Sequence, residues 1–187
     1  ISPGINASFV LMAVITCFLS PLIYNIISPR EMLKGEKVII VGGSSSGVLL
    51  ARRLKMHGRN ALIVENNRKR YLEMLSKGLN TYFGDGLDKQ VYTRLNLQPH
   101  NYVVVITESE RKNTQICNML KEEWGHPKII SKSSSLHTED YFRKLQVEYV
   151  DVTRIMATTM ENLILRPSTY HTLVETFENY KVEDIVI

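Results

Sequence analysis

The chain has 187 residues, of which 44% are hydrophobic and 22% are charged, and its formal net charge is +4. These values exclude a disordered chain and fit one domain of ordinary size with a short additional segment. The basic residues are spread along the sequence and form no stripe with aromatic residues, so we expect no nucleic-acid binding. Cys17 and Cys117 lack the spacing of a zinc site and lie in very different surroundings, so we expect neither a metal site nor a disulfide framework.

The first part of the chain is an uncharged apolar run, which reads FVLMAVITCFLSPLIYNII over residues 9–27. Its length is close to the ~20 residues that cross a bilayer as a helix, so we predict a transmembrane-like helix and linker over residues 1–34. A buried helix of a soluble core is the alternative. Basic residues follow the run at Arg30, Lys34 and Lys37, and none precedes it. The positive-inside rule therefore predicts that the rest of the chain lies in the cytoplasm, as the tail end of a larger membrane protein.

From residue 37 onward, short apolar runs alternate with helical patterns. Strands are predicted over residues 37–41, 61–64, 79–83, 102–106, 128–130 and 147–150. Helices are predicted between them, over residues 48–57, 70–77, 88–95, 114–124 and 137–145. Because a helix follows nearly every strand, the strands must pair in parallel through right-handed crossovers. We therefore predict an α/β fold over residues 35–152, a Rossmann-like doubly wound parallel sheet of six strands.

The turn after the first strand fits two different functions. Counted from Gly42, the sequence GGSSSG is nearly the G-x-G-x-x-G turn of dinucleotide-binding proteins, with Ser44 in place of the middle glycine. Counted from Gly43, it is the G-x-S-x-G nucleophile elbow of serine hydrolases, with Ser45 as the nucleophile. A hydrolase needs several strands before the elbow, then an acid and a histidine on later strands. Here the elbow follows the first strand and His137 has no obvious acid partner, so the hydrolase is the weaker hypothesis.

A dinucleotide site also requires an acidic residue at the end of the second strand, about 20 residues after the turn, to accept hydrogen bonds from ribose hydroxyls. Glu65 directly follows the strand at 61–64. A carboxylate at this place repels a 2′-phosphate, which favours NAD and adenosine nucleotides, while Arg68 nearby keeps NADP as an alternative. The side chain of Ser44 would hold a phosphate farther from the backbone, which suits a mononucleotide. The predicted phosphate loop consists of Gly42, Gly43, Ser44, Ser45, Ser46 and Gly47.

The region from residue 36 to 152 resembles the nucleotide-binding N-terminal half of the domains that regulate conductance of potassium, called RCK, KTN or TrkA-N domains. The resemblance is carried by KVIIVGGSSSG, LIVENN, YFGDGLD and YVVVITESERKN, which place four strand ends in the family's order. Residues 84–86 resemble the family's G-D-[AG] signature, and Thr107-Glu108 with Asn113 resemble its other pocket elements. The resemblance implies NAD(H) or an adenine mononucleotide (AMP, ADP or ATP) as the ligand. The further cofactor-binding residues that it implies are Asn66, Arg68, Asp85, Gly86, Thr107 and Glu108.

The segment before residue 30 is similar to the last membrane helix of cation:proton antiporter-2 family exchangers, which often carry such a domain on their cytoplasmic tail. Residues 153–187 then correspond to a linking helix and the start of a second lobe. An apolar stripe on this helix predicts self-association, and the alternative is that the stripe packs back onto its own sheet edge. The stripe consists of Ile155, Met156, Thr159, Met160 and Leu163.

The resemblance implies a nucleotide-binding regulatory domain of a monovalent cation transporter, a cation:proton antiporter or a potassium transport system, at the inner membrane. Its partners would be the nucleotide, a membrane transport domain and a second copy in a homodimer or larger ring. About 35 residues follow the last strand, too few for the substrate domain of an enzyme, so we predict no catalytic residues. A small NAD(P)-dependent oxidoreductase or epimerase fragment is the alternative. Its Tyr-x-x-x-Lys pair is not formed at Tyr141, where Leu145 holds the lysine position.

Overall fold

The computed structural model describes residues 36–168 and residue 170. The strands are β1 (Lys37–Val41), β2 (Asn60–Glu65), β3 (Thr81–Phe83), β4 (Tyr102–Val105), β5 (Ile129–Ser133) and β6 (Glu148–Asp151). They form one parallel sheet in the order β3-β2-β1-β4-β5-β6. This is the strand order of the Rossmann fold, so the predicted doubly wound six-stranded sheet is confirmed.

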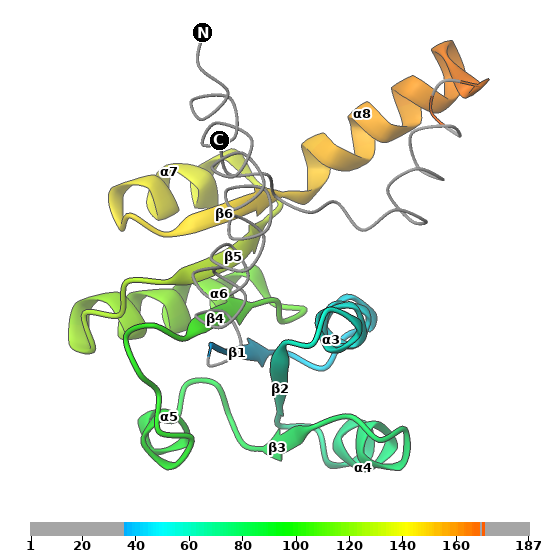
Figure 1. Cartoon of the computed structure of the whole chain (residues 1–187). Coiled ribbons are helices and arrows are strands. Elements are labelled where there is room, and N and C mark those ends of the chain that lie inside the picture. The colour runs from blue at the N-terminus through cyan, green and yellow to red at the C-terminus, as the bar shows by residue number, and fades with distance from the viewer. Residues whose placement is uncertain (1–35, 169, 171–187) are drawn as a thin grey trace, which may run out of the picture.

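The helices lie on both faces of this sheet (Figure 1). They are α3 (Ser45–Met56), α4 (Arg68–Ser76), α5 (Lys89–Arg94), α6 (Glu110–Asn118), the π-helical turn η1 (Met119–Glu123), α7 (Leu136–Lys144) and α8 (Val152–Leu165). In Figure 1, α3 and α4 cover one face, and α5, α6 and α7 cover the other. The predicted membrane helix at residues 9–27 and the predicted start of a second lobe, after residue 170, lie outside the described residues. Within residues 36–168, no helix is both long and apolar enough to cross a bilayer.

Each α-helix in this part of the chain begins behind a short polar residue whose side chain accepts a hydrogen bond from an amide of the first turn. The six capping residues are Ser44, Asn67, Asp88, Ser109, Ser135 and Asp151. Such caps satisfy amides that have no partner within the helix, and each contributes about 1 kcal/mol. α3, α4 and α6 follow the carboxyl ends of β1, β2 and β4, so their caps also fix the loops of that edge.

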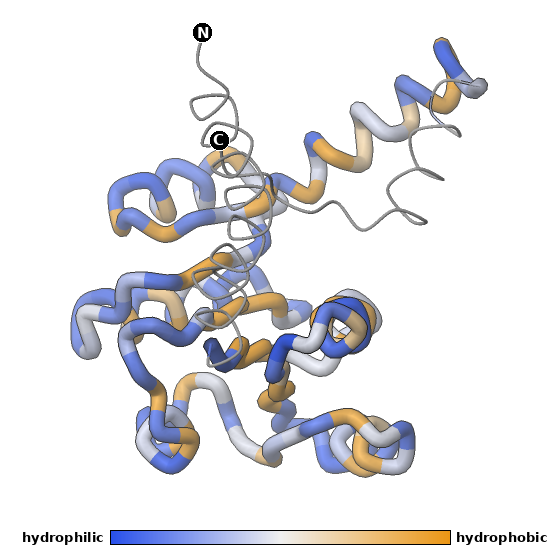
Figure 2. The backbone as a smooth tube through the Cα atoms, in the orientation of Figure 1, coloured by the Kyte–Doolittle hydropathy of each residue, from blue (hydrophilic) through white to orange (hydrophobic). Residues whose placement is uncertain are grey.

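Buried residues extend to both faces of the sheet because side chains alternate along each strand. Ile39 of β1 packs with Tyr92 of α5 in the core beneath α5, α6 and α7. The next residue, Ile40, packs with Met74 of α4 in the smaller core on the other face. Figure 2 shows hydrophobic residues along the central strands, whereas the helices on either side alternate between hydrophobic and hydrophilic residues. The sheet is therefore buried on both sides in its centre, as a parallel sheet requires.

The last helix, α8, differs from the others because none of its residues is buried. In Figure 1 it projects away from the sheet. Its stripe residues Ile155, Met156 and Met160 are 54%, 52% and 56% exposed. The structure therefore does not have the alternative arrangement in which the stripe packs back onto the chain's own sheet. The prediction of self-association stays open, and the stripe is free to make it.

Candidate functional site

The loops that follow β1, β2, β3 and β4 meet at the carboxyl edge of the sheet and enclose a cavity of about 220 Å³. The cavity lies where β1 and β4 are neighbours, which is the point at which the strand order reverses. In open α/β sheets this crevice is where ligands bind. A second cavity of about 440 Å³, which we call the α3–α4 groove, lies between those two helices and adjoins the first.

The turn after β1 is pressed against the end of β4. Gly42 has a φ of +119°, a conformation that favours glycine, and a Cβ atom at this position would lie 2.9 Å from the carbonyl oxygen of Ile106. Ser44 donates a hydrogen bond to that same carbonyl at 3.4 Å and accepts one from the amide of Gly47 at 3.5 Å. The Ser44 hydroxyl therefore caps α3 and links the turn to β4, in addition to lining the cavity.

The turn also requires glycine at position 47, where a Cβ atom would lie 2.2 Å from the carbonyl oxygen of Gly42. Backbone cannot yield as a side chain can, so we expect Gly47→Ala to lower the free energy of unfolding by about 1–3 kcal/mol. Chemical denaturation measures this change. Ser46→Ala is the matched control at the exposed neighbouring position, and we expect it to stay within about 0.5 kcal/mol. Equal stability of the two variants would contradict the close approach of these backbone segments.

Glu65 at the end of β2 locks the first two loops together. Its side chain is 4% exposed, and its two oxygens accept hydrogen bonds from the amides of Gly43 at 2.8 Å and Asn67 at 2.7 Å. A Cβ atom at position 43 would lie 2.5 Å from the Met74 methyl carbon and 2.7 Å from Glu65 Oε2, so a larger residue there would displace these side chains. A carboxylate offers about four acceptor positions, and two remain for further donors. The arrangement therefore leaves Glu65 able to accept two hydroxyl groups while it holds the turn.

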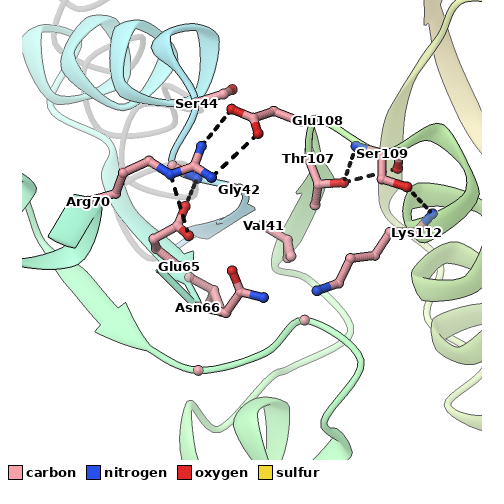
Figure 3. Close-up of a pocket in the computed structure, with 14 residues that line it drawn as sticks. Val41, Gly42, Ser44, Glu65, Asn66, Arg70, Thr107, Glu108, Ser109 and Lys112 are labelled. Atoms are coloured by element: carbon pink, nitrogen blue, oxygen red, sulfur yellow. Dashed lines mark hydrogen bonds and ion pairs between the residues drawn. The ribbon is translucent and has the colours of Figure 1, made fainter. Parts of the chain in front are cut away.

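Arg70 of α4 connects the two halves of the fold across the cavity (Figure 3). Its guanidinium donates two hydrogen bonds to the carboxylate of Glu108, at 2.6 Å and 3.4 Å, and its Nε lies 4.0 Å from Glu65. The hydrogen bonding with Glu108 raises the pKa of Arg70 above its ordinary value. The arginine thus lies between two carboxylates, one fixed on the β1 turn and the other on the loop after β4.

A second ion pair lies at the other side of the cavity. Lys112 of α6 is 2.9 Å from the carboxylate of Asp85, which also accepts hydrogen bonds from Asn66 at 3.4 Å and from the Leu87 amide at 3.0 Å. Burial would raise the pKa of the Asp85 carboxyl, but the Leu87 amide and the Lys112 ammonium outweigh it and hold the pKa below its ordinary value. Asp85 is therefore a carboxylate that fixes Lys112 and Asn66 beside the cavity.

The loop after β4 is held by a fully buried asparagine. Asn113 Oδ1 accepts hydrogen bonds from the amide of Thr107 at 3.0 Å and from its hydroxyl at 2.6 Å. Its Nδ2 has no hydrogen-bond partner in the part of the chain that the structure describes. Thr107 and Ser109 line the cavity, so Asn113 shapes the wall from behind.

The structure brings eight of the thirteen predicted site residues to the cavity wall. They are Gly42, Gly43, Ser44, Glu65, Asn66, Gly86, Thr107 and Glu108. The other five lie elsewhere. Asp85 stands behind the wall and holds Lys112. Ser45 lines the α3–α4 groove, Ser46 faces an apolar groove on the sheet, and Gly47 is buried under the turn. Arg68 is the exposed first residue of α4 and lines neither the cavity nor the α3–α4 groove, so the structure does not bring it together with the others.

Sequence reasoning missed the two cations of the cavity, Arg70 and Lys112. Both lie within helices, one turn or less after a strand-end loop, and neither belongs to a glycine motif. No sequence signal marked them, because each is paired with an acidic residue of the site only in the folded chain. Arg68 was chosen for its closeness in sequence to Glu65, whereas the helix that begins at this residue turns Arg70 toward the cavity instead.

The structure places no histidine beside Ser45 to act as a general base. No histidine lines either the cavity or the α3–α4 groove that Ser45 borders. In the described ranges, no three histidine, cysteine, aspartate or glutamate side chains are grouped so that they could hold a metal ion. The chemistry that the cavity does offer is hydrogen bonding and ion pairing, from a carboxylate, an arginine, a lysine and the polar loop after β4.

Comparison with known proteins places this geometry in a family. Residues 38–152 match the sequence profile of the TrkA-N domain. A Trk system potassium uptake protein TrkA homolog of Methanothermobacter thermautotrophicus is 27% identical over 157 residues, which are 80% of this chain and 70% of that protein.

Two solved structures share the fold. The Shewanella denitrificans Kef CTD in its AMP-bound form has a TM-score of 0.59 at 18% identity, over 77% of this chain and 92% of that one. The GsuK channel bound to NAD has a TM-score of 0.60 at 15% identity, over 72% of this chain and 24% of that one. The profile match covers more than half of the sequence, and the fold and the glycine turn agree with it. The chain therefore belongs to the TrkA-N domain family.

Proposed function

We propose that the chain is a nucleotide-binding regulatory domain of a potassium transport system. The observation that carries this proposal is the buried carboxylate of Glu65, fixed on the glycine turn at the point where the strand order reverses. That is the place where Rossmann folds bind the ribose and phosphate of a nucleotide. Family membership agrees with the proposal, as does the likeness to a protein described as a TrkA homolog for potassium uptake.

The ligand that we propose is NAD(H) or an adenine mononucleotide, AMP, ADP or ATP. The ribose hydroxyls would donate to Glu65 and the phosphate would lie against the turn of Gly42 and Gly43. A cavity of about 220 Å³ that opens into a groove of about 440 Å³ suits a compact nucleoside with its phosphate at the opening. AMP in the Kef CTD and NAD in the GsuK channel are consistent with this ligand class.

We further propose that the transport partner is a cation:proton antiporter and that residues 9–27 form its last membrane helix. The support is the uncharged apolar run and the basic residues that follow it. The domain would then lie on the cytoplasmic side of the inner membrane. Its role would be regulatory and not catalytic. The nucleotide would bind two conformations of the domain with different affinity, and this difference would shift the transporter between its states.

A chain of hydrogen bonds connects the cavity to α8 and supports such a role. Glu110 follows the loop that carries Glu108, and its carboxylate accepts a hydrogen bond from the Ser134 amide at 2.8 Å. Burial would raise the pKa of the Glu110 carboxyl, but hydrogen bonds from Ser134 and Thr138 outweigh it and hold the pKa below its ordinary value. The carbonyl of Ser134 accepts in turn from the hydroxyl of Thr153 in α8 at 3.2 Å. A movement of the loop after β4 would therefore be felt at the start of α8.

Calorimetric titration of the purified chain with AMP, ADP, ATP, NAD, NADH and NADP tests the proposal. We expect saturable binding of at least one adenine nucleotide or NAD form. We expect NADP to bind at least about tenfold more weakly than NAD, because its 2′-phosphate would face the carboxylate of Glu65. Failure of all six ligands to bind would refute the proposal, and equal binding of NAD and NADP would refute the placement of the ribose.

A further inference from the structure

The cavity wall has as many carboxylates as cations. Its lining residues include the carboxylates of Glu65 and Glu108 and the cations of Arg70 and Lys112, and Asp85 stands directly behind Lys112. Both cations are already paired with a carboxylate. A phosphate group that enters this site therefore has no unpaired cation waiting in the cavity wall. If the phosphate pairs with a cation of this wall, in addition to the amides of the turn, it takes that cation from one of the two existing pairs.

The two pairs differ in how firmly they are held. The carboxylate of Asp85 has three donors, Lys112, Asn66 and the Leu87 amide, and the Lys112 side chain is 25% exposed. The Arg70–Glu108 pair is more open, since its side chains are 37% and 69% exposed. Exposed ion pairs contribute little to stability. The Arg70–Glu108 pair is therefore the easier of the two to exchange.

Position also favours Arg70. The general rule for this fold places the ligand's phosphate on the turn after β1. That turn, at Gly43 and Ser44, lines both the cavity and the α3–α4 groove, and so do Arg70 and Glu108. Figure 3 shows the guanidinium between the carboxylates of Glu65 and Glu108, close to Gly42 and Ser44. A phosphate on the turn would therefore lie beside Arg70. The guanidinium can donate two parallel hydrogen bonds to a phosphate, as it does to the carboxylate of Glu108.

We propose that Arg70 is the phosphate-recognising residue of the nucleotide site and that Glu108 competes with the ligand for it. This inference rests on the proposed nucleotide-binding function. The Glu108 carboxylate accepts two hydrogen bonds from the guanidinium, and binding exchanges this carboxylate for the ligand's phosphate. The exchange releases Glu108 and with it the bond between α4 and the loop after β4. Selectivity for a phosphorylated ligand over the bare nucleoside therefore depends on these two residues.

Titration of the full chain and its variants with AMP and with adenosine tests the exchange. Glu108→Gln removes the competing charge, and we expect it to tighten AMP binding about three- to tenfold and to leave adenosine binding within about twofold. Arg70→Gln should weaken AMP binding at least about tenfold with the same small effect on adenosine. In Arg70→Gln/Glu108→Gln, the gain from Glu108→Gln should be lost. Glu73→Gln is the matched control, because Glu73 lines the α3–α4 groove but pairs with Lys77.

The outcomes separate this inference from the function on which it rests. If the wild-type chain binds neither adenosine nor AMP, the exchange is overturned, and the proposed function falls with it only if ADP, ATP, NAD, NADH and NADP also fail to bind. If it binds AMP but Glu108→Gln does not tighten that binding, or tightens adenosine equally, only the exchange is overturned. A gain from Glu73→Gln as large as that from Glu108→Gln would also overturn it, because the effect would then be general charge reduction. Melting curves of each variant establish that the fold is retained.

Discussion

Replacement of Glu65 by alanine is expected to weaken nucleotide binding at least about tenfold. The hydrogen bonds that a charged carboxylate would make to the ribose contribute about 1.5–3 kcal/mol, which corresponds to roughly 10- to 150-fold in affinity. The loss has a second cause in the structure. Glu65 accepts hydrogen bonds from the amides of Gly43 and Asn67. Its removal therefore also breaks the bond that fixes the turn on which the phosphate would rest.

Two measurements distinguish these causes. Calorimetry gives the dissociation constant, and chemical denaturation gives the free energy of unfolding. The free energy of unfolding should fall because two backbone amides lose their acceptor. The loss is about 1–3 kcal/mol for each amide that is left buried and unpaired. Glu122→Ala is the matched control, since Glu122 is an exposed acidic residue that lines neither the cavity nor the α3–α4 groove. We expect it to change neither quantity. An unchanged dissociation constant in Glu65→Ala would remove Glu65 from the ribose site, even if stability falls.

The strands were predictable because their physical signal is strong. A parallel strand that is buried on both faces is a short run of β-branched residues that ends in glycine or polar residues, and β1 and β4 both have this form. The prediction was least accurate where polar side chains are buried. β5 extends to Ser133, beyond the predicted end at residue 130. Ser131 satisfies its hydroxyl by donating to the Val105 carbonyl at 3.2 Å, so a serine occupies a core position without a hydrophobic signal.

Helix boundaries show the same limit in another form. The helix predicted over residues 114–124 begins at Glu110, because Ser109 accepts a hydrogen bond from the Lys112 amide and caps it. Its first turn is polar, so the apolar periodicity begins only later. This early start is what brings Lys112 to the cavity. One cause therefore explains both the wrong helix boundary and the failure to predict Lys112. Hydrophobic patterns cannot locate the first turn of a helix when that turn is polar.

The site itself was predictable to the extent that it consists of strand ends. Glycines and an acid at the ends of successive strands must come together at one edge of a parallel sheet, and Gly42, Glu65 and Glu108 do so. Side chains that reach the same edge from helices depend on the angle at which each helix leaves its loop. That angle is set by tertiary packing, so Arg70 could be found only once the fold was in view.

The second large effect concerns α8, where a single charge is expected to convert a dimer into monomers. Met160 lies in the apolar stripe and is 56% exposed, and no residue of the helix is buried against the rest of the chain. A second apolar surface lies beside it in the fold, a groove of about 620 Å³ that includes Leu50, Tyr102 and Ile130 on the sheet face next to α3. Apolar surfaces of this kind are normally covered by another protein surface, and a second copy would cover them here.

Sedimentation of residues 35–187 measures the outcome. We expect the wild type to be a dimer at micromolar concentration and Met160→Glu to be a monomer with an unchanged melting curve, because burial of an unpaired carboxylate in an apolar interface costs far more than one methionine contributes. Thr158→Glu introduces the same charge two residues earlier, on the opposite side of the helix from the stripe, and should remain a dimer. A wild-type monomer at high micromolar concentration would contradict the pairing. It would also remove the simplest route by which the effect of nucleotide binding could be transmitted to a transport partner. That route consists of the hydrogen bonds that connect Glu110, Ser134 and Thr153.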